Sequence, residues 1–496
     1  MKTTLSSCIL VAAFAFTSLA ACESSTPKPD PTVTPKPVAA SPEGESEGDV
    51  VGAASTLCAF DSAWLTPGAL PSEVSGPTQC DFHKFMWHAF SQLVQPSGTS
   101  GKLLLETWMP TYGIFVADGQ SPTAWGTTPA NPCSSQGDGE ALLFSGITKQ
   151  AGVMQPLIDQ QGNNVYYGVS LNKTAYDFVT SCELYKYGCG AQLGRNDAGV
   201  DLIKKYPNLA FPDGSAELKT AWKVMTTAEA AGGSFYTIKG LIQPNSAAPT
   251  VCEEKTLGLV GLHIVLKTPD HPEFVWGTFE QRNNAPDCET LSASPASGSW
   301  TFFDETTYKA CKTEHCTNTY VPGVATQVCR EHPYGDSNSG AYPNGNNCSV
   351  TPNQRICQPD VQAALQKNTA AMKSINTSAA TAFSSQAAFK VWAGYELTGN
   401  IWTSDGTPAG KGVLPPSQRA WAGSLSSANI TMETYVQNGQ AGVINPASCF
   451  TCHSMVSGDG APDLPPAGLS HIFHELVPGG GGCSDGNLPA TCNGGS

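Results

Sequence analysis

The sequence predicts an α+β fold: a large, disulfide-rich mixed domain around a central β-hairpin or sheet, followed by a small, mainly helical C-terminal region. Two apolar segments, residues 257–266 and 274–280, are separated by a turn that contains Pro269 and Pro272. Apolar runs of this length between turn residues are typical of buried, paired strands. Helical periodicity elsewhere and 18 cysteines complete the prediction of a mixed, cross-linked fold.

Several segments have the apolar spacing of amphipathic helices. The clearest is residues 81–93, where Phe82, Phe85, Met86 and Phe90 recur on one face. The other predicted helices are residues 216–227, 360–375, 386–397 and 427–437.

Shorter apolar and aromatic stretches predict the remaining regular structure. Residues 103–116 and 164–171 favour strands or irregular segments, and residues 235–242 favour a strand. Residues 288–357 contain six cysteines among Asn, Gly, Ser and Pro, which indicates an irregular excursion held by disulfides. Within the central hairpin, His263 faces the same side as Gly261 and Val265. Glu280 and Lys267 are considered as partners for its imidazole.

The N-terminus has the features of an export signal: Lys2, an apolar run over residues 8–19, and small residues before Cys22. The ending Leu-Ala-Ala-Cys resembles the lipobox of bacterial lipoproteins, in which cleavage precedes lipidation of the cysteine. We expect residues 1–21 to be a signal peptide and residues 22–52 to be a Pro-rich tether that begins at lipidated Cys22. This predicts an exported protein, anchored by lipid alone and facing the periplasm or cell surface. Glu23 favours the outer membrane of a Gram-negative bacterium.

The folded part of the 496-residue chain is expected to comprise a large α+β domain, residues 53–403, and a C-terminal region, residues 404–496. The net charge is −15 and no basic cluster interrupts the folded part, so we expect no nucleic-acid partner. The cysteines suggest up to seven disulfides once the signal, the lipid and the motif described next are set aside. Short loops are expected for four close pairs: Cys182 with Cys189, Cys311 with Cys316, Cys348 with Cys357, and Cys483 with Cys492.

The most specific motif is Cys449-Phe450-Thr451-Cys452-His453, near the end of the chain. Cys-x-x-Cys-His is the c-type haem attachment pattern, in which two thiols bond the porphyrin and the imidazole binds the iron. The motif therefore predicts one covalent haem c, with His453 as an axial ligand, in a cytochrome c-like C-terminal region. His471 and His474 follow at a spacing outside the usual zinc finger, and a thioredoxin-like pair leaves His453 unexplained.

The sixth iron ligand is left open by the sequence. Only 43 residues follow His453, and Met455 is too close to reach the opposite side of a porphyrin. The candidates are Met432, His471, His474 and His263, or an open position. A Met or His ligand favours electron transfer, whereas an open position permits small-molecule chemistry.

Six segments, in order, resemble a poorly characterised group of large exported bacterial proteins, the cytochrome c family proteins. They are FHKFMWHAFSQL, ELKTAWKVM, GLVGLHIVLKTP, FVWGTFEQRNN, SANITMETYVQ and CFTCH. The resemblance covers most of residues 80–453. It implies export and a single c-type haem at Cys449, Cys452 and His453.

Three functions follow as hypotheses. The first is a periplasmic or outer-membrane-anchored monohaem c-type cytochrome acting in electron transfer with an unidentified redox partner. The second is a haem-dependent redox enzyme, peroxidase- or oxygenase-like, with an open iron site under the large domain and a small-molecule substrate. The third is a binding module with a structural haem. The sequence does not decide whether the protein is an enzyme.

Overall fold

A computed structural model describes the chain from residue 58 to residue 492, with gaps. The described residues are 58–98, 101–116, 120–130, 142–144, 155–194, 202–243, 252–291, 295, 298–310, 320–321, 323–331, 349–351, 354–356, 359–404, 421–424, 428–437, 449–453, 464–476 and 487–492. The predicted signal peptide, the tether, Cys22, Met455 and most of the region around the expected boundary at residue 404 lie outside them.

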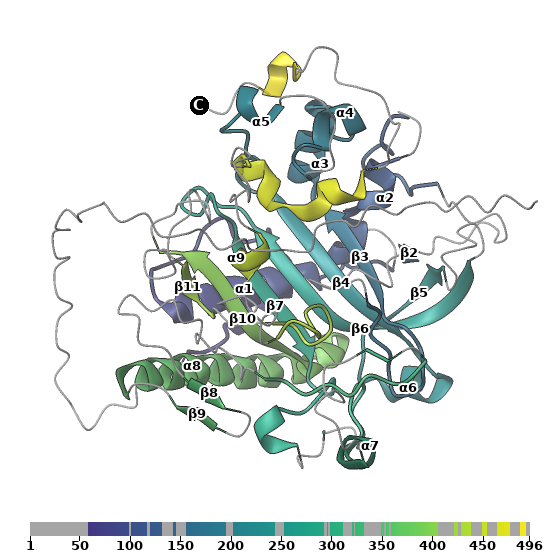
Figure 1. The fold of residues 1–496 in the computed structure, drawn as a ribbon, viewed down its shortest axis with the longest axis vertical. Coiled ribbons are helices and arrows are strands. Elements are labelled where there is room, and N and C mark those ends of the chain that lie inside the picture. The colour runs from purple at the N-terminus through teal and green to yellow at the C-terminus, as the bar shows by residue number, and fades with distance from the viewer. Residues whose placement is uncertain are drawn as a thin grey trace, which may run out of the picture.

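A nine-stranded sheet forms the centre of the described part (Figure 1). Its main path runs β1-β3-β4-β6-β7-β10-β11, all antiparallel, while β5 pairs with β6 and, in parallel, with β2. The bounds are β1 Met109–Pro110, β2 Leu142–Phe144, β3 Tyr166–Leu171, β4 Ala216–Val224, β5 Thr237–Ile242, β6 Glu253–Leu266, β7 Val275–Gln281, β10 Tyr395–Thr403 and β11 Trp421–Gly423; β8 Ser349–Thr351 and β9 Gln354–Ile356 form a separate pair.

Two long helices and several short ones accompany the sheet. The α-helices are α1 Gln79–Leu93, α2 Thr111–Ile114, α3 Lys173–Ser181, α4 Tyr187–Gly190, α5 Leu202–Lys205, α6 Thr227–Gly232, α7 Glu305–Ala310, α8 Pro359–Ser384 and α9 Cys449–Cys452. The 3₁₀ helices are η1 Ser62–Leu65, η2 Leu104–Thr107, η4 Cys288–Thr290, η5 Ala387–Gly394, η7 Pro466–Leu469, η8 His471–Glu475 and η10 Ala490–Cys492. The prediction of a mixed α+β, disulfide-containing fold is confirmed.

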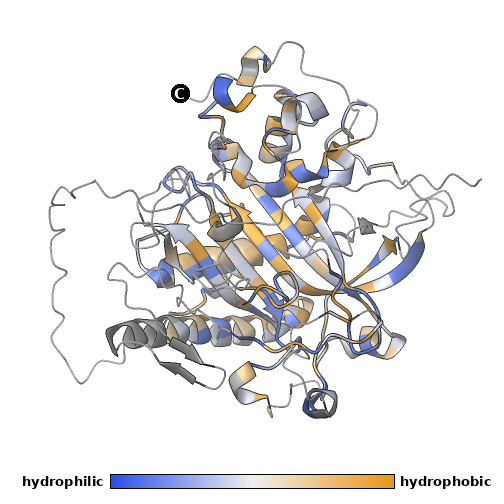
Figure 2. Cartoon of the chain, viewed as in Figure 1, coloured by the Kyte–Doolittle hydropathy of each residue, from blue (hydrophilic) through white to orange (hydrophobic). Residues whose placement is uncertain are grey.

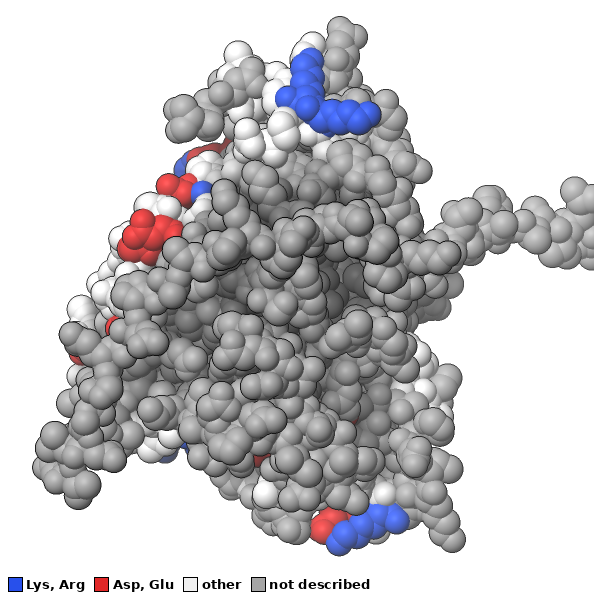
Figure 3. Space-filling model, turned by 60° about the vertical axis from the view of Figure 1, so that its left-hand side comes forward, with Lys and Arg blue, Asp and Glu red and all other residues white. Residues whose placement is uncertain are grey.

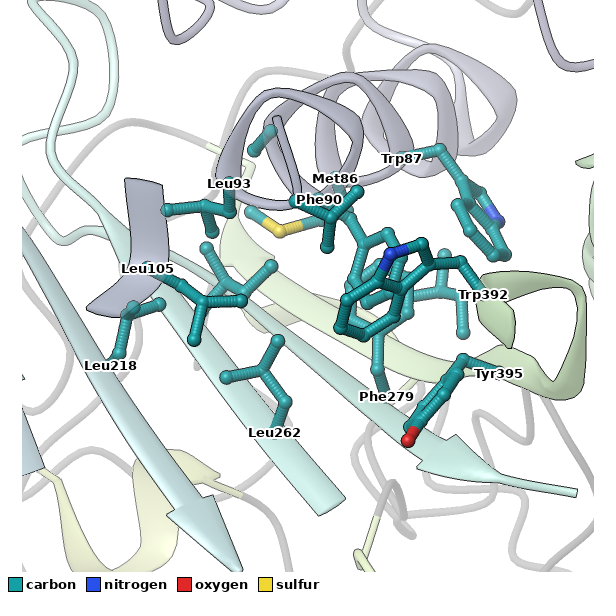
Figure 4. Close-up of a cluster of buried hydrophobic side chains, with 14 of the residues drawn as sticks. Met86, Trp87, Phe90, Leu93, Leu105, Leu218, Leu262, Phe279, Trp392 and Tyr395 are labelled. Atoms are coloured by element: carbon teal, nitrogen blue, oxygen red, sulfur yellow. The ribbon is translucent and has the colours of Figure 1, made fainter. Parts of the chain in front are cut away.

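One side of the sheet, which we call the helix face, is covered by α1 and α8. Helix α1 begins after Thr78, which forms a capping box with Asp81. The Thr78 hydroxyl accepts a hydrogen bond from Asp81 N, and the Asp81 carboxylate accepts one from Thr78 N. Its apolar residues pack with Leu218, Leu262 and Phe279 of the strands and with Trp392 and Tyr395 (Figure 4). Gly277 lets α1 approach β7 closely, because any larger side chain there would collide with Met86.

The opposite side, which we call the site face, carries two smaller apolar clusters. One gathers around Leu171, Val265, Trp276, Phe450 and Phe473. The other surrounds Tyr167, Ala221, Val260, Ile430 and Met432. Alternation along the strands, visible as alternating colours in Figure 2, assigns neighbouring residues to the two faces. The two clusters leave a polar stretch of sheet between them.

The central hairpin is confirmed, since β6 and β7 pair antiparallel with Leu262 opposite Phe279 and His263 opposite Thr278. The helix predicted at residues 81–93 and the strand at 235–242 are also confirmed as α1 and β5. Residues 164–171 contain β3, and residues 103–116 contain η2, β1 and α2. The helix predicted at residues 360–375 is part of the longer α8.

Two helix predictions are wrong, and a third, residues 386–397, is correct only for its first part. Residues 216–224 form β4, because β3 and β6 supply backbone hydrogen bonds on both sides and bury both of its faces. In residues 386–397, the 3₁₀ helix η5 gives way at Tyr395 to β10, which pairs with β7. Residues 428–437 form turns, because side chains such as Asn429 and Glu433 bind the local backbone instead of leaving it to helical bonds.

The described disulfides are Cys58–Cys80, Cys182–Cys492 and Cys288–Cys329, and Cys189 and Cys252 are also disulfide-bonded. The expected pairs Cys182–Cys189 and Cys483–Cys492 are therefore wrong. Folding places Cys492 beside Cys182 at the end of α3, although 310 residues separate them in sequence. Cys311, Cys316, Cys348 and Cys357 lie outside the described residues.

Candidate haem-attachment site

The Cys-x-x-Cys-His motif forms the single helical turn α9, and His453 N donates to Cys449 O at its end (2.8 Å). Phe450 anchors this turn to the site face: it is fully buried and its ring meets Trp276 of β7 edge-on, with centroids 6.5 Å apart. In Figure 1, α9 lies in front of β7 and β10. The motif is thus packed onto the central sheet through its apolar middle residue.

The imidazole of His453 is held by two further contacts. Its Nδ1 lies 2.7 Å from the carbonyl oxygen of Leu469, and its ring packs on Trp276 with centroids 4.3 Å apart. A carbonyl oxygen only accepts hydrogen bonds, so we assign the proton of the neutral ring to Nδ1. This tautomer leaves the lone pair of Nε2 for a metal, and a backbone carbonyl on the other nitrogen is the usual outer partner of a metal-bound histidine.

His453 is neutral at ordinary pH. Removal from water lowers its pKa to about 4; the charges of Lys219 and His263 act in the same direction, and the Leu469 carbonyl and Glu433 oppose them. Neutral imidazole is the form that binds iron.

Cys449 is a partly buried thiol that is not in a disulfide. This distinguishes it from Cys58, Cys182, Cys288 and their partners, which are all oxidised. Cys452 lies three positions along the same helical turn. The backbone therefore presents two cysteine positions and a metal-competent histidine within five residues, and this donor set fits a covalently attached haem.

Among the candidate sixth ligands, His471 and His474 lie beside His453. The His453 and His471 rings are stacked with centroids 3.8 Å apart, and His474 stacks on His471 at 5.0 Å. Rings in face-to-face contact cannot bind one iron from opposite sides of a porphyrin. This arrangement therefore does not make either of them the ligand opposite His453.

Met432 and His263 lie on the site face but in different surroundings. The side chain of Met432 is fully buried in the apolar cluster with Tyr167 and Val260. His263 stands in the polar stretch between the two apolar clusters, and its Nε2 lies 3.1 Å from Glu433 Oε1. The expected partners of His263 are wrong: Glu280 pairs with Arg330 in two bonds of 2.8 and 2.9 Å, and Lys267 pairs with Asp213.

The polar stretch contains, besides His263, residues that the sequence did not single out. Lys219, His263 and Thr278 are register partners on β4, β6 and β7, and so form a row across the site face. Residues 428–437 fold over this row: Asn429 donates to Thr278 Oγ1 (2.8 Å), and Asn429 N donates to Glu433 (2.8 Å). Gly261 permits the close approach, because a side chain there would strike Thr431 and Asn429.

The charge of Glu433 is stabilised within this group. Burial alone would raise the pKa of Glu433, but the His263 charge and hydrogen bond, the Lys219 charge and the Asn429 amide lower it overall. A carboxylate and an imidazole in contact therefore lie near His453. The sequence could not predict this contact, because Glu433 and His263 are 170 residues apart.

A second carboxyl group on the site face behaves differently. Glu217 of β4 is almost completely buried, and its Oε1 has no hydrogen-bond partner within the described residues. Burial raises the pKa of Glu217 to about 7, and only the hydrogen bond with Ser470 opposes this shift. Ser470 links Leu469, whose carbonyl holds His453, to His471.

The described charged side chains are spread over separate parts of the surface. In the view of Figure 3, the described Lys and Arg side chains gather mainly at two opposite ends of the molecule, with acidic groups at one edge. Among the described residues, no helix is long and apolar enough to cross a membrane. No group of three or more His, Cys, Asp or Glu side chains in that part of the chain is arranged to hold a metal ion by itself.

Comparison of the chain with models of protein families, with curated proteins and with solved structures finds no match.

Proposed function

We propose that this protein is an exported c-type cytochrome that carries one haem and transfers electrons. Cys449 and Cys452 would bond the porphyrin, and His453 would bind the iron through Nε2. The haem supplies one-electron redox chemistry when bound. The observation that carries the proposal is the state of His453: it is neutral and is oriented through Nδ1 by the Leu469 carbonyl.

The chemistry of the cysteines supports the same assignment. Haem attachment needs two thiols at a fixed spacing, and Cys449, a partly buried cysteine that is not in a disulfide, shares one helical turn with Cys452. The six segments that resemble exported cytochrome c family proteins, together with the lipobox-like ending at Cys22, support a lipid-anchored protein outside the cytoplasm. We assign it to the periplasmic or external side of an outer membrane.

The second candidate function is a haem-dependent redox enzyme of the peroxidase or oxygenase type. It is favoured by the His263–Glu433 pair, which offers an acid–base group close to His453. The burial of Met432 and the stacking of His471 on His453 also favour an open sixth position. A binding module with a structural haem is the third candidate.

The attachment chemistry is tested by co-expressing the chain with a c-type haem maturation system. We expect haem that survives denaturation to be lost from the double variant Cys449→Ser, Cys452→Ser. Thr451→Ala, which changes only a variable position of the motif, is the matched control and should keep the haem. Haem that stayed bound to the denatured double variant would refute the proposed attachment.

The three candidate functions are separated by optical spectra of the haem-loaded protein, oxidised and reduced, with and without carbon monoxide. A low-spin iron that ignores carbon monoxide supports electron transfer and counts against the enzyme. A high-spin iron that binds carbon monoxide supports the enzyme, and His263→Leu should then shift that spectrum. A haem that no physiological reductant can reduce would favour the structural role.

A further inference from the structure

Three imidazoles form a column that leads from the attachment site to the surface. The His453 and His471 rings are nearly parallel, at 23° with centroids 3.8 Å apart, and the His471 and His474 rings follow at 25° and 5.0 Å. Exposure increases along this order, from partly buried His453 and His471 to exposed His474. The column thus has one end at the proposed haem ligand and the other in solvent.

The column is set by the local backbone. His471 and His474 are three residues apart on η8, and residues at this spacing eclipse one another on a 3₁₀ helix. Between them, Ile472 and Phe473 are buried in the apolar cluster that also holds Phe450. The Ser470 hydroxyl caps Ile472 N (3.3 Å), and the preceding Leu469 carbonyl holds His453. One segment therefore positions all three rings.

The rings are poorly arranged for chelation. In a stack, faces of the imidazoles oppose one another, whereas a metal site needs nitrogen lone pairs that converge on one point. The rate of electron tunnelling falls steeply as the gap between two groups widens. Conjugated rings that lie close together in space divide a long gap into short ones. The arrangement suits electron passage better than metal binding.

We propose that His471 and His474 are the route by which electrons pass between the haem site and a one-electron redox protein that docks over η8. This inference rests on the proposed cytochrome function. His471 and His474 are positioning groups for the electron path, and neither is the second iron ligand. The partner's redox centre would lie over exposed His474, at the end of the column.

The test attaches a photoactive ruthenium complex to His474 of the full-length, haem-loaded protein and measures electron transfer to the iron after a laser flash. We expect His471→Ala to slow this step by roughly tenfold, equivalent to about 1.4 kcal/mol, because removing the ring widens the gap across which the electron tunnels. His471→Phe should keep most of the rate, because it retains a flat ring. His88→Ala, on α1 at the helix face, is the control and should leave the rate unchanged.

Two readouts separate this inference from the function on which it rests. The optical spectrum and the midpoint potential should be the same in the wild type and in His471→Ala, because the iron ligands are unaltered. A changed spectrum would show that His471 is an iron ligand, and this would overturn the proposed route. An unchanged transfer rate would also overturn it, because the electron would then not pass through His471. A chain that carries no covalent haem would refute the cytochrome function itself, before the route is tested.

Discussion

The two faces of the central sheet are built from the same strands and differ in what covers them. On the helix face, α1 and α8 bury an almost wholly apolar cluster that includes Trp87, Phe90 and Phe279. On the site face, the turns of residues 428–437 cover the row of Lys219, His263 and Thr278. The first face holds the largest single apolar cluster, and the second holds ionisable groups near His453.

The contrast teaches how one sheet serves stability and chemistry together. Apolar burial is non-directional, so regular helices suffice to cover the helix face. Buried ionisable groups need specific hydrogen-bond partners, and on the site face irregular segments supply several of them. Asn429 and Glu433 come from such a segment, and the Leu469 carbonyl lies at the end of the short 3₁₀ helix η7.

The largest effect is expected on the helix face. Phe90 is fully buried, with Phe279 stacked at 4.6 Å and Trp87 at 5.2 Å edge-on. We expect Phe90→Ala to lower the free energy of unfolding by about 4 kcal/mol, because it removes contacts and leaves a cavity. Urea unfolding measures the change.

Phe389 is the matched control for this substitution, since it lies at the edge of the same cluster and is only partly buried. Phe389→Ala should cost distinctly less than Phe90→Ala. If both variants lost the same free energy of unfolding, the degree of burial would not determine how much each side chain contributes to stability.

An effect of opposite sign is expected on the site face. The pKa of Glu217 is about 7 in the folded protein against 4.5 for an ordinary Glu, so the folded chain keeps this proton between those pH values while the unfolded chain loses it. Stability therefore falls as pH rises from about 4.5 to 7. Glu217→Gln should remove this loss and stabilise the protein at pH 8 by about 3 kcal/mol, with little effect near pH 4.

Denaturation curves at both pH values test this, with Glu254→Gln as the control because Glu254 is exposed at the start of β6. The control should show no comparable pH-dependent gain. If Glu217→Gln destabilised the protein equally at both pH values, the carboxyl group would be contributing hydrogen bonds and the burial argument would be wrong.

The smallest effect is expected at the start of α1. Thr78→Ala removes the hydroxyl that caps Asp81 N, and this should cost about 1 kcal/mol. Thr78→Ser keeps the cap and should be nearly neutral. Thermal unfolding of the two variants measures how much of the protein's stability depends on this cap. A loss of stability as large as that of Phe90→Ala would contradict a minor role for the cap.

Much of the helix face could be predicted from local pattern. The spacing of Phe82, Phe85 and Met86 predicts α1, and the apolar runs predict β6 and β7. Strand β4 was missed because Leu218, Ala221 and Trp222 also satisfy a helical spacing. Only its hydrogen bonds to β3 and β6 select the strand.

The site was predictable only where its residues are adjacent in sequence. Cys449, Cys452 and His453 form a motif, so the sequence alone was enough to predict where a haem would be attached. The tertiary structure alone decided that Leu469 orients His453, that His263 meets Glu433, and that Cys182 joins Cys492. The physical reason is that attachment chemistry needs neighbours along five residues, whereas orientation, burial and pKa depend on groups that folding brings from distant parts of the chain.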